Sequence, residues 1–438
     1  MSTLVPSKMD LSIKTKLVDH AGSLEDSTVP KLLAISYSYP PKQEPRAIQV
    51  SRLLKHLNAS TMLVCEGTDG DGHDGSESFL ERTLRVPFSP SSGRDLLHRL
   101  SSRMYLPVLS RTPDHLGPWK KSVLKTVDHL LNMQGYRPDV LVTFAFPLID
   151  NIIGLELKRR YNLPWLAHFS DPWVDSPFRN DDPLTKTLNG WLEQSVIENA
   201  DRLVFTSNET AMLVMDKYRS TLRSKVRVVS HAFEPDLFER TPHDNNGRLN
   251  IRYLGDLYHT RTPEPLFQAL EILSSAEPVL LSRFCFEIVG DVHELDMEQM
   301  GLSRLPPGLV VFRPRVNYAE SLSLMTSAAG LMVIDAPVPK NTESVFLPSK
   351  LIEYVGAERP IIGLTPPGTA AYLIARLGGW VADPGATNQV AEVLRQFLSF
   401  VWEHRDQRVS VWGRSEVRSE YEVTAVASKF QEVLAELM

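Results

Sequence analysis

Short apolar runs alternate with amphipathic stretches along the chain from Lys31 onward. The runs in the first half are LLAISYSY, STMLVC, DVLVTFAF, PWLAHF, RLVFTS and VRVVS. Those in the second half are NIRYLG, FCFEIVG, LVVFRP, GLMVID, PIIGL and GWVA. They are rich in Val, Ile and Phe and carry apolar residues on both faces, which is typical of strands buried in parallel sheets. The pattern predicts two series of six strands each.

Helical periodicity fills the intervals between these runs. In VSRLLKHL, for example, Val50, Leu53, Leu54 and Leu57 follow the i, i+3, i+4, i+7 spacing of a helix with one buried face. Strands that alternate with helices predict right-handed βαβ units and doubly wound sheets. Because twelve strands do not fit comfortably in one sheet, we expect an α/β protein of two Rossmann-like domains facing each other across a cleft.

The polar stretch ERTPHDNNGR reads as the linker between the two domains. The predicted organisation is a loosely ordered extension over 1–30, an N-terminal Rossmann-like domain over 31–240, a C-terminal Rossmann-like domain over 241–415 and a C-terminal amphipathic helix over 416–438. That helix should pack back toward the N-terminal domain, since one of its faces is apolar. The face consists of Val423, Val426, Ala427, Phe430, Val433, Leu434 and Leu437.

Composition narrows the function classes. Of 438 residues, 42% are hydrophobic and 23% charged, as in ordinary globular proteins, and the formal net charge of −6 argues against a nucleic-acid partner. The two cysteines, Cys65 and Cys285, lie far apart in apolar runs, which predicts neither a disulfide nor a zinc site and favours a reducing cytoplasm. No apolar run approaches the ~18 residues of a membrane span, and the N-terminus lacks the apolar core of a signal peptide.

Open α/β sheets bind ligands beyond the carboxyl ends of their strands, so the candidate residues are those that follow strands. In FLPSKLIEY, Pro348 suits the first turn of a helix, Ser349 suits a cap, and Lys350 and Glu353 share a face. The helix N-terminus and Lys350 would attract a diphosphate, and Glu353 would accept hydrogen bonds from ribose. Leu351 belongs to the same helix start and completes this part of the donor site. An exposed Lys350–Glu353 ion pair fits the same spacing.

Gly255 ends another predicted strand, and Arg261 follows at the start of a helix. The glycine permits a close backbone approach, and the guanidinium can hold phosphate oxygens in bidentate fashion. An ordinary surface arginine in a βα loop is the alternative.

The N-terminal half offers an acceptor side. Asp171 follows the strand PWLAHF and precedes a proline, so its carboxylate stands at the sheet edge, with His168 close by as either a site or a core histidine. Pro41 and Arg46 belong to the first predicted βα loop, which would shape the same side of the cleft. That loop lacks the glycine fingerprint of dinucleotide-binding enzymes, which argues against an NAD-dependent dehydrogenase.

Two further stretches carry side chains of interest. DGDGHDG fails the EF-hand pattern and is better explained as a surface turn, so we predict no metal site. Residues 94–125 interleave basic and apolar side chains, which fits either amphipathic helices or a peripheral contact with a membrane-bound, anionic acceptor at the inner face of the membrane.

Taken in order, these motifs resemble the GT-B-fold retaining glycosyltransferases of glycosyltransferase family four, the group 1 glycosyltransferases. The matching pieces run from ISYSYPPKQEPRAIQVSRL through IRYLGDLYHTRTPEPLFQAL to FLPSKLIEYVGAERPII. The resemblance implies that Glu353 binds the donor ribose, that Lys350 and Arg261 neutralise the donor diphosphate beside Gly255, and that Asp171 lies on the acceptor side. Asp171, Arg261 and Lys350 are therefore the predicted catalytic residues.

The chain departs from this family at three places. Val345 stands where the first glutamate of the family's pair is expected, with Glu343 two residues earlier. The usual glycine pair of the first loop is replaced by the segment Glu44 to Ala47, and the usual Asn-Gly before the linker by His231-Ala232.

The predicted function is sugar transfer from a UDP- or GDP-linked donor to a glycan, lipid-linked or small-molecule acceptor, as in polysaccharide biosynthesis. It would proceed with retention and without a metal or other cofactor. A nucleotide-sugar epimerase and a non-catalytic nucleotide-sugar-binding scaffold are the alternatives.

Overall fold

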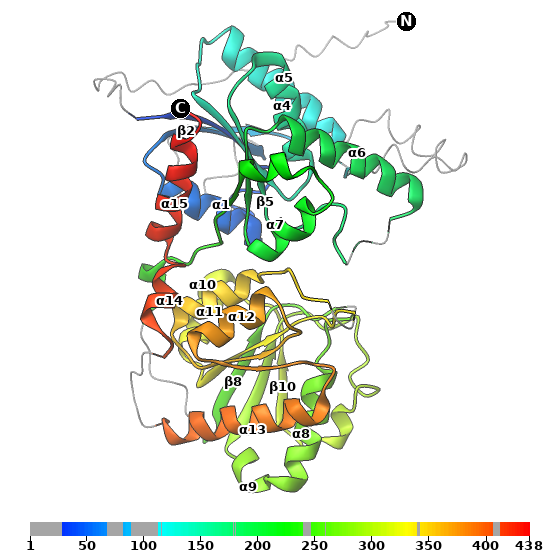
Figure 1. The fold of residues 1–438 in the computed structure, drawn as a ribbon. Coiled ribbons are helices and arrows are strands. Elements are labelled where there is room, and N and C mark those ends of the chain that lie inside the picture. Colours follow the sequence, from blue (N-terminus) through cyan, green and yellow to red (C-terminus); the bar gives the residue numbers. More distant parts are fainter. Residues whose placement is uncertain are drawn as a thin grey trace, which may run out of the picture.

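The computed structural model describes residues 29–67, 82–88, 113–114, 116–177, 179, 181–239, 247–258, 260–339, 342–405 and 412–438. These residues form two α/β domains, one above the other in Figure 1, and each is built on one parallel sheet. Residues 1–28 of the predicted extension and most of the stretch 94–125 lie outside the described residues. Two α/β domains on parallel sheets confirm the predicted fold class.

The N-terminal domain contains the described strands β1 to β7 in the order β3-β2-β1-β4-β5-β6-β7. They are β1 (Lys31–Ile35), β2 (Ser60–Glu66), β3 (Arg82–Val86), β4 (Val140–Ala145), β5 (Trp165–Phe169), β6 (Arg202–Phe205) and β7 (Val226–Val228). Its helices are α1 (Pro45–Lys55), α4 (Gly117–Asn132), α5 (Ile149–Tyr161), α6 (Pro183–Asn199) and α7 (Asn208–Met215), with 3₁₀ turns η1 (Ser220–Lys225) and η2 (Pro235–Leu237).

The C-terminal domain follows the same plan, with its strands in the order β10-β9-β8-β11-β12-β13. They are β8 (Leu249–Leu254), β9 (Phe284–Val289), β10 (Val310–Arg313), β11 (Gly330–Ile334), β12 (Ile361–Leu364) and β13 (Trp380–Ala382). Helices α8 (Glu264–Ala276), α9 (Pro278–Leu281), α10 (Tyr318–Thr326), α11 (Ser349–Ala357), α12 (Thr369–Leu377) and α13 (Thr387–Glu403) cover it, with the 3₁₀ turn η3 (Leu302–Arg304).

The strand order of each sheet reverses at one point. In the N-terminal domain it reverses where β1 pairs with β4, and in the C-terminal domain where β8 pairs with β11. Loops on opposite sides of such a switch point turn away from each other and leave a crevice at the carboxyl ends of the strands. The residues that follow β1, β4, β8 and β11 are therefore placed to form ligand sites.

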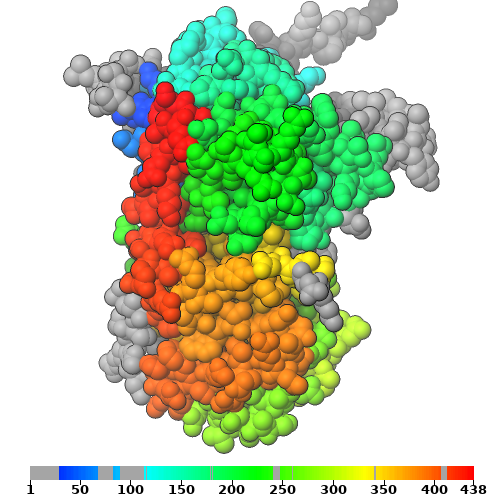
Figure 2. Space-filling model, in the orientation of Figure 1, coloured from blue at the N-terminus to red at the C-terminus, as the bar shows by residue number. Residues whose placement is uncertain are grey.

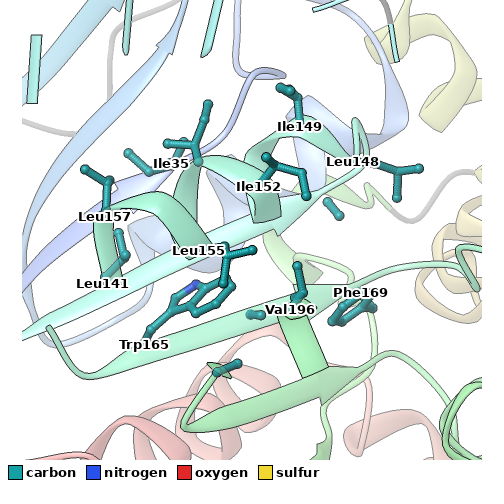
Figure 3. Packing of buried hydrophobic residues seen from close by; sticks show 14 of the residues in the cluster. Ile35, Leu141, Leu148, Ile149, Ile152, Leu155, Leu157, Trp165, Phe169 and Val196 are labelled. Atoms are coloured by element: carbon teal, nitrogen blue, oxygen red, sulfur yellow. The ribbon is translucent and has the colours of Figure 1, made fainter. Parts of the chain in front are cut away.

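Close packing of helix on sheet fixes the N-terminal core. Figure 3 shows Ile149 and Ile152 of α5 above Leu141 of β4 and Trp165 of β5. The helix comes so near the sheet that a Cβ atom at Gly154 would lie 2.6 Å from the Trp165 ring and 2.7 Å from Thr143. Glycine is the residue that this approach requires.

The end of the chain returns to the N-terminal domain. After α14 (Ser415–Ser419), helix α15 (Val423–Ala435) runs along the upper domain, and Figure 2 shows this segment in red along one side of the molecule. Phe430 is fully buried there and stacks on Phe144 of β4 at 6.2 Å between ring centroids. The predicted docking of the last helix on the N-terminal domain is confirmed.

Two local predictions are wrong. The N-terminal sheet has a strand, β3, that was not foreseen because its sequence RTLRV mixes two arginines with apolar residues, as befits a half-exposed edge strand. Ser349 does not cap α11: the N-cap position is Pro348, which precedes the helix rather than lying in its first turn, and no side chain closes that end.

Candidate active site

The first half of the site lies at the carboxyl ends of β8 and β11, which are neighbours in the C-terminal sheet. Gly255 follows β8 with φ 134°, a conformation that favours glycine. Asp335 follows β11 and is 2% exposed. Helix α11 begins nearby and contributes Lys350, so residues from three separate segments meet at one sheet edge.

Lys350 is packed against this edge. Its Nζ donates a hydrogen bond to the Tyr253 hydroxyl at 2.5 Å and lies 3.9 Å from the centre of that ring. A Cβ atom at Gly255 would come within 2.5 Å of the same Nζ. The absent side chain of Gly255 therefore makes room for the ammonium group of Lys350.

Arg261 is anchored beside Lys350. Its Nη2 donates to Asp335 Oδ1 at 3.0 Å, and its Nε is buried with no hydrogen-bond partner among the described residues. Burial, and next the charge of Arg261, lower the pKa of Lys350 to about 7, while Asp335 and Asp256 oppose the shift. The structure thus brings Gly255, Arg261 and Lys350 into one cluster, in which two cations face the single anchoring carboxylate of Asp335.

Glu353 faces a different partner. Its Oε1 accepts from Arg52 Nη1 at 3.0 Å, so the alternative of an exposed Lys350–Glu353 ion pair is not what holds this carboxylate. Arg52 lies on α1 of the other domain. Burial raises the pKa of Glu353, and Arg52 opposes that rise.

The side chains of Ser349 and Leu351 make no contact with the cluster formed by Lys350 and Arg261 among the contacts described above. Ser349 is the half-buried first residue of α11. Leu351 is fully buried in the hydrophobic core, so its side chain packs inside the domain instead of lining a ligand site.

Val345, which stands where the family has its first glutamate, takes part in a contact between the two domains. Val345 is 8% exposed, and its carbonyl accepts from Ser207 Oγ at 3.2 Å and from Thr210 Oγ1 at 2.9 Å. Glu343 instead accepts from the hydroxyl of Tyr372, which is 44% exposed on α12. The contact that the structure gives the Glu343 carboxylate is therefore with α12.

The residues predicted for the acceptor side gather at the carboxyl edge of the N-terminal sheet. Arg46 donates to the Ala145 carbonyl and lies 3.1 Å from His168 Nδ1. Burial raises the pKa of Asp171, with Ser170 and Arg46 opposing. Burial also lowers the pKa of His168 well below its usual value. Pro41 is half-buried in the loop before α1.

Several residues of this region escaped sequence reasoning. Asp150, at the start of α5, is fully buried; its Oδ2 accepts from the Tyr37 N–H at 2.9 Å, and Oδ1 has no described partner. Burial of His231 lowers its pKa to about 3. Asp335 could have been found, because it directly follows the run GLMVI. Arg52 could not, since its contact with Glu353 spans 301 positions.

Within the described residues, no group of three or more His, Cys, Asp or Glu side chains is arranged to hold a metal ion. The DGDGHDG segment lies outside those residues. In the same part of the chain, no helix is both long enough and apolar enough to cross a membrane.

Comparison with known proteins agrees with this architecture. Residues 47–231 match the model of the glycosyl transferase 4-like domain. This match covers most of the N-terminal domain, and the two facing Rossmann-like domains form a GT-B fold. The match agrees with the resemblance drawn from the sequence motifs and identifies residues 47–231 as a glycosyl transferase 4-like domain. A search of curated proteins finds no match.

Solved structures share the fold over nearly the whole chain. HepE from Anabaena, in complex with UDP and glucose, is 14% identical with a TM-score of 0.64, over 93% of this chain and 100% of its own. Sucrose-phosphate synthase from Thermosynechococcus elongatus is 16% identical with a TM-score of 0.64, over 93% and 99%. An E. coli trehalose-6-phosphate structure bound to UDP-2-fluoro glucose is 13% identical with a TM-score of 0.58, over 93% and 98%.

Proposed function

We propose that this glycosyltransferase takes a UDP- or GDP-linked sugar on its C-terminal domain and transfers the sugar to an acceptor held by its N-terminal domain. The observation that carries the proposal is the pair of cations, Arg261 and Lys350, at the carboxyl edge of β8 and β11. Cleavage of a sugar–diphosphate bond places negative charge on the departing diphosphate. Fixed cations at that position stabilise the transition state more than the ground state.

The chain's own residues supply the parts of this reaction. Asp335 fixes the guanidinium of Arg261, and Gly255 leaves space for the Lys350 ammonium. Two cations at the diphosphate can do the work that a divalent ion does elsewhere, which supports a metal-independent reaction. A retaining outcome rests on the family resemblance alone.

The acceptor belongs on the N-terminal side, near Arg46, His168 and Asp171. A glycan or lipid-linked sugar is the proposed class. Of the basic stretch 94–125, the structure describes the end that includes Lys120, Lys121 and Lys125 on α4, where Lys121 and Lys125 are exposed. We propose a peripheral contact at the cytoplasmic face of the membrane through this stretch, with binding to anionic vesicles as its measurement.

A thermal-shift screen of UDP- and GDP-sugars tests the donor site. The wild type should be stabilised by at least one of them, and Arg261→Ala and Lys350→Ala should each lose most of that shift. Arg395→Ala and Lys429→Ala, which remove exposed charges far from this edge, serve as matched controls and should keep it. If no nucleotide sugar stabilises the wild type, or if all four variants respond alike, the donor site is elsewhere.

Val345 favours one alternative, a scaffold that binds nucleotide sugars without transferring them, because its position is committed to a contact between the domains. Release of UDP or GDP over time separates the two candidates. A transferase releases the nucleotide when a suitable acceptor is present, whereas a scaffold shows the thermal shift and no release.

A further inference from the structure

The contact between Arg52 and Glu353 joins the two domains at the predicted ribose carboxylate. Arg52 belongs to α1 at the lower edge of the N-terminal domain, and Glu353 to α11 at the upper edge of the C-terminal domain (Figure 1). Their side chains are 3% and 10% exposed. An ion pair this deeply buried differs from an exposed one, because breaking it leaves an uncompensated charge.

Arg52 is held on three sides. Its Nη1 donates to the carbonyl of Ala232, just before the linker, as well as to Glu353, and its Nη2 donates to the Tyr318 hydroxyl of α10 at 2.6 Å. Glu234 lies 3.9 Å from its Nε. The planar guanidinium therefore binds the segment that follows β7 and two helices of the C-terminal domain at once, which a lysine could not reproduce.

Only one of the two carboxylate oxygens of Glu353 takes part in this contact. Oε1 accepts from Arg52 and the Tyr318 hydroxyl lies close to the same carboxylate, whereas Oε2 is buried and has no hydrogen-bond partner among the described residues. A buried carboxylate oxygen without a donor is costly, and a ligand hydroxyl would satisfy it.

We propose that Arg52 is a positioning residue of the donor site, which orients Glu353 so that Oε2 receives a ribose hydroxyl of the donor. The inference rests on the proposed function. Because the N-terminal domain covers Glu353, the donor enters with the domains apart, and Arg52 returns to Oε1 as they close. Recognition of ribose and closure of the cleft are thereby one event.

The test compares three probes that differ in what they can offer Glu353. They are UDP and GDP, their 2′,3′-dideoxy counterparts, and inorganic pyrophosphate, each titrated by calorimetry into the full chain. The variants are Arg52→Met, Arg52→Lys and the control Lys55→Met, which removes a neighbouring cation of α1 that pairs with Glu234, between β7 and η2.

If Arg52 acts through the ribose, Arg52→Met weakens binding of the ribonucleotide about tenfold, the effect of one hydrogen bond to a charged group. Its affinities for the dideoxynucleotide and for pyrophosphate stay unchanged, as do all affinities of Lys55→Met. Arg52→Lys should resemble Arg52→Met.

Equal weakening of all three probes by Arg52→Met would mean a general structural role and would overturn the inference, as would no weakening at all. A wild type that binds neither UDP nor GDP would overturn the proposed function and this inference together. A wild type that binds a ribonucleotide and its dideoxy counterpart equally would leave the donor site standing and remove the role of Arg52.

Discussion

Lys350 is a cation whose charge depends on its surroundings. Burial and the neighbouring Arg261 lower its pKa from 10.5 to about 7, so the empty protein releases its proton near neutral pH. A bound diphosphate favours the charged form and raises that pKa again. Binding therefore takes up a proton above pH 7, and the affinity should fall as the pH rises.

The affinity for UDP or GDP, whichever binds, should fall close to tenfold between about pH 7.5 and 8.5, a range in which the nucleotide's own phosphates are fully ionised. Calorimetry in buffers of different ionisation enthalpy measures both the affinity and the proton uptake. Lys350→Met should bind more weakly with a nearly flat profile over the same range. An equally steep profile in that variant would assign the titration to another group.

The same residues show which parts of the site can be predicted from the sequence. Gly255, Arg261 and Lys350 were recognisable because each follows a strand whose apolar run is plain in the sequence. The three residues meet because β8 and β11 are neighbours in the sheet. Parallel strands joined by helices place the loops that follow them at the same edge, so this meeting was foreseeable. The pairing of Arg52 with Glu353 depends on how two domains close, and no local spacing encodes it.

At the level of the elements, hydrophobic runs predicted the buried strands and missed the exposed one. All six strands of the second series were foreseen, whereas β3 was not, because Arg82 and Arg85 interrupt its apolar residues. Helix α5 shows the opposite case. Gly154 looks unfavourable in a helix by propensity, yet the nearness of Trp165 requires it.

Gly154→Ala should destabilise the N-terminal domain by about 1–2 kcal/mol, since overpacking outweighs the gain in helix propensity. Gly190→Ala in α6 is the matched control, because nothing lies within 4 Å of the Cβ that it would add. That substitution should stabilise the domain by up to about 1 kcal/mol. Chemical denaturation followed by tryptophan fluorescence measures both, and midpoints that shift in the same direction would contradict the packing argument.

On the scale of the whole molecule, the last helix belongs to the first domain. Helix α15 completes the core around β1, β2 and β4, and Glu436 pairs with Arg202 and Arg227 at its end. The C-terminal domain is therefore an insertion between two parts of the N-terminal one. The apolar face of the last helix predicted that it docks. The 3.6-residue period of that face is the same whatever the helix packs against, so it did not identify the partner.

Phe430→Ala should destabilise the N-terminal domain by about 3–5 kcal/mol, the usual cost of emptying a buried phenylalanine site. Glu432→Ala, on the exposed face of the same helix, should change stability by less than about 0.5 kcal/mol. Limited proteolysis and thermal unfolding report the difference. If Phe430→Ala left both unchanged, α15 would not be part of the core.

The chain crosses between the domains twice, and the two crossings touch. Phe233 on the way down and Glu422 on the way back form a parallel bridge, in which the Phe233 N–H donates to the Tyr421 carbonyl and the Val423 N–H to the Phe233 carbonyl, both at 2.9 Å. Two joined crossings resist twisting and sliding more than a single strand does. The two domains should consequently rotate about this joined pair of segments as a hinge. Each closure would then return Lys350 and Arg261 to the same position relative to the carboxyl edge of the N-terminal sheet.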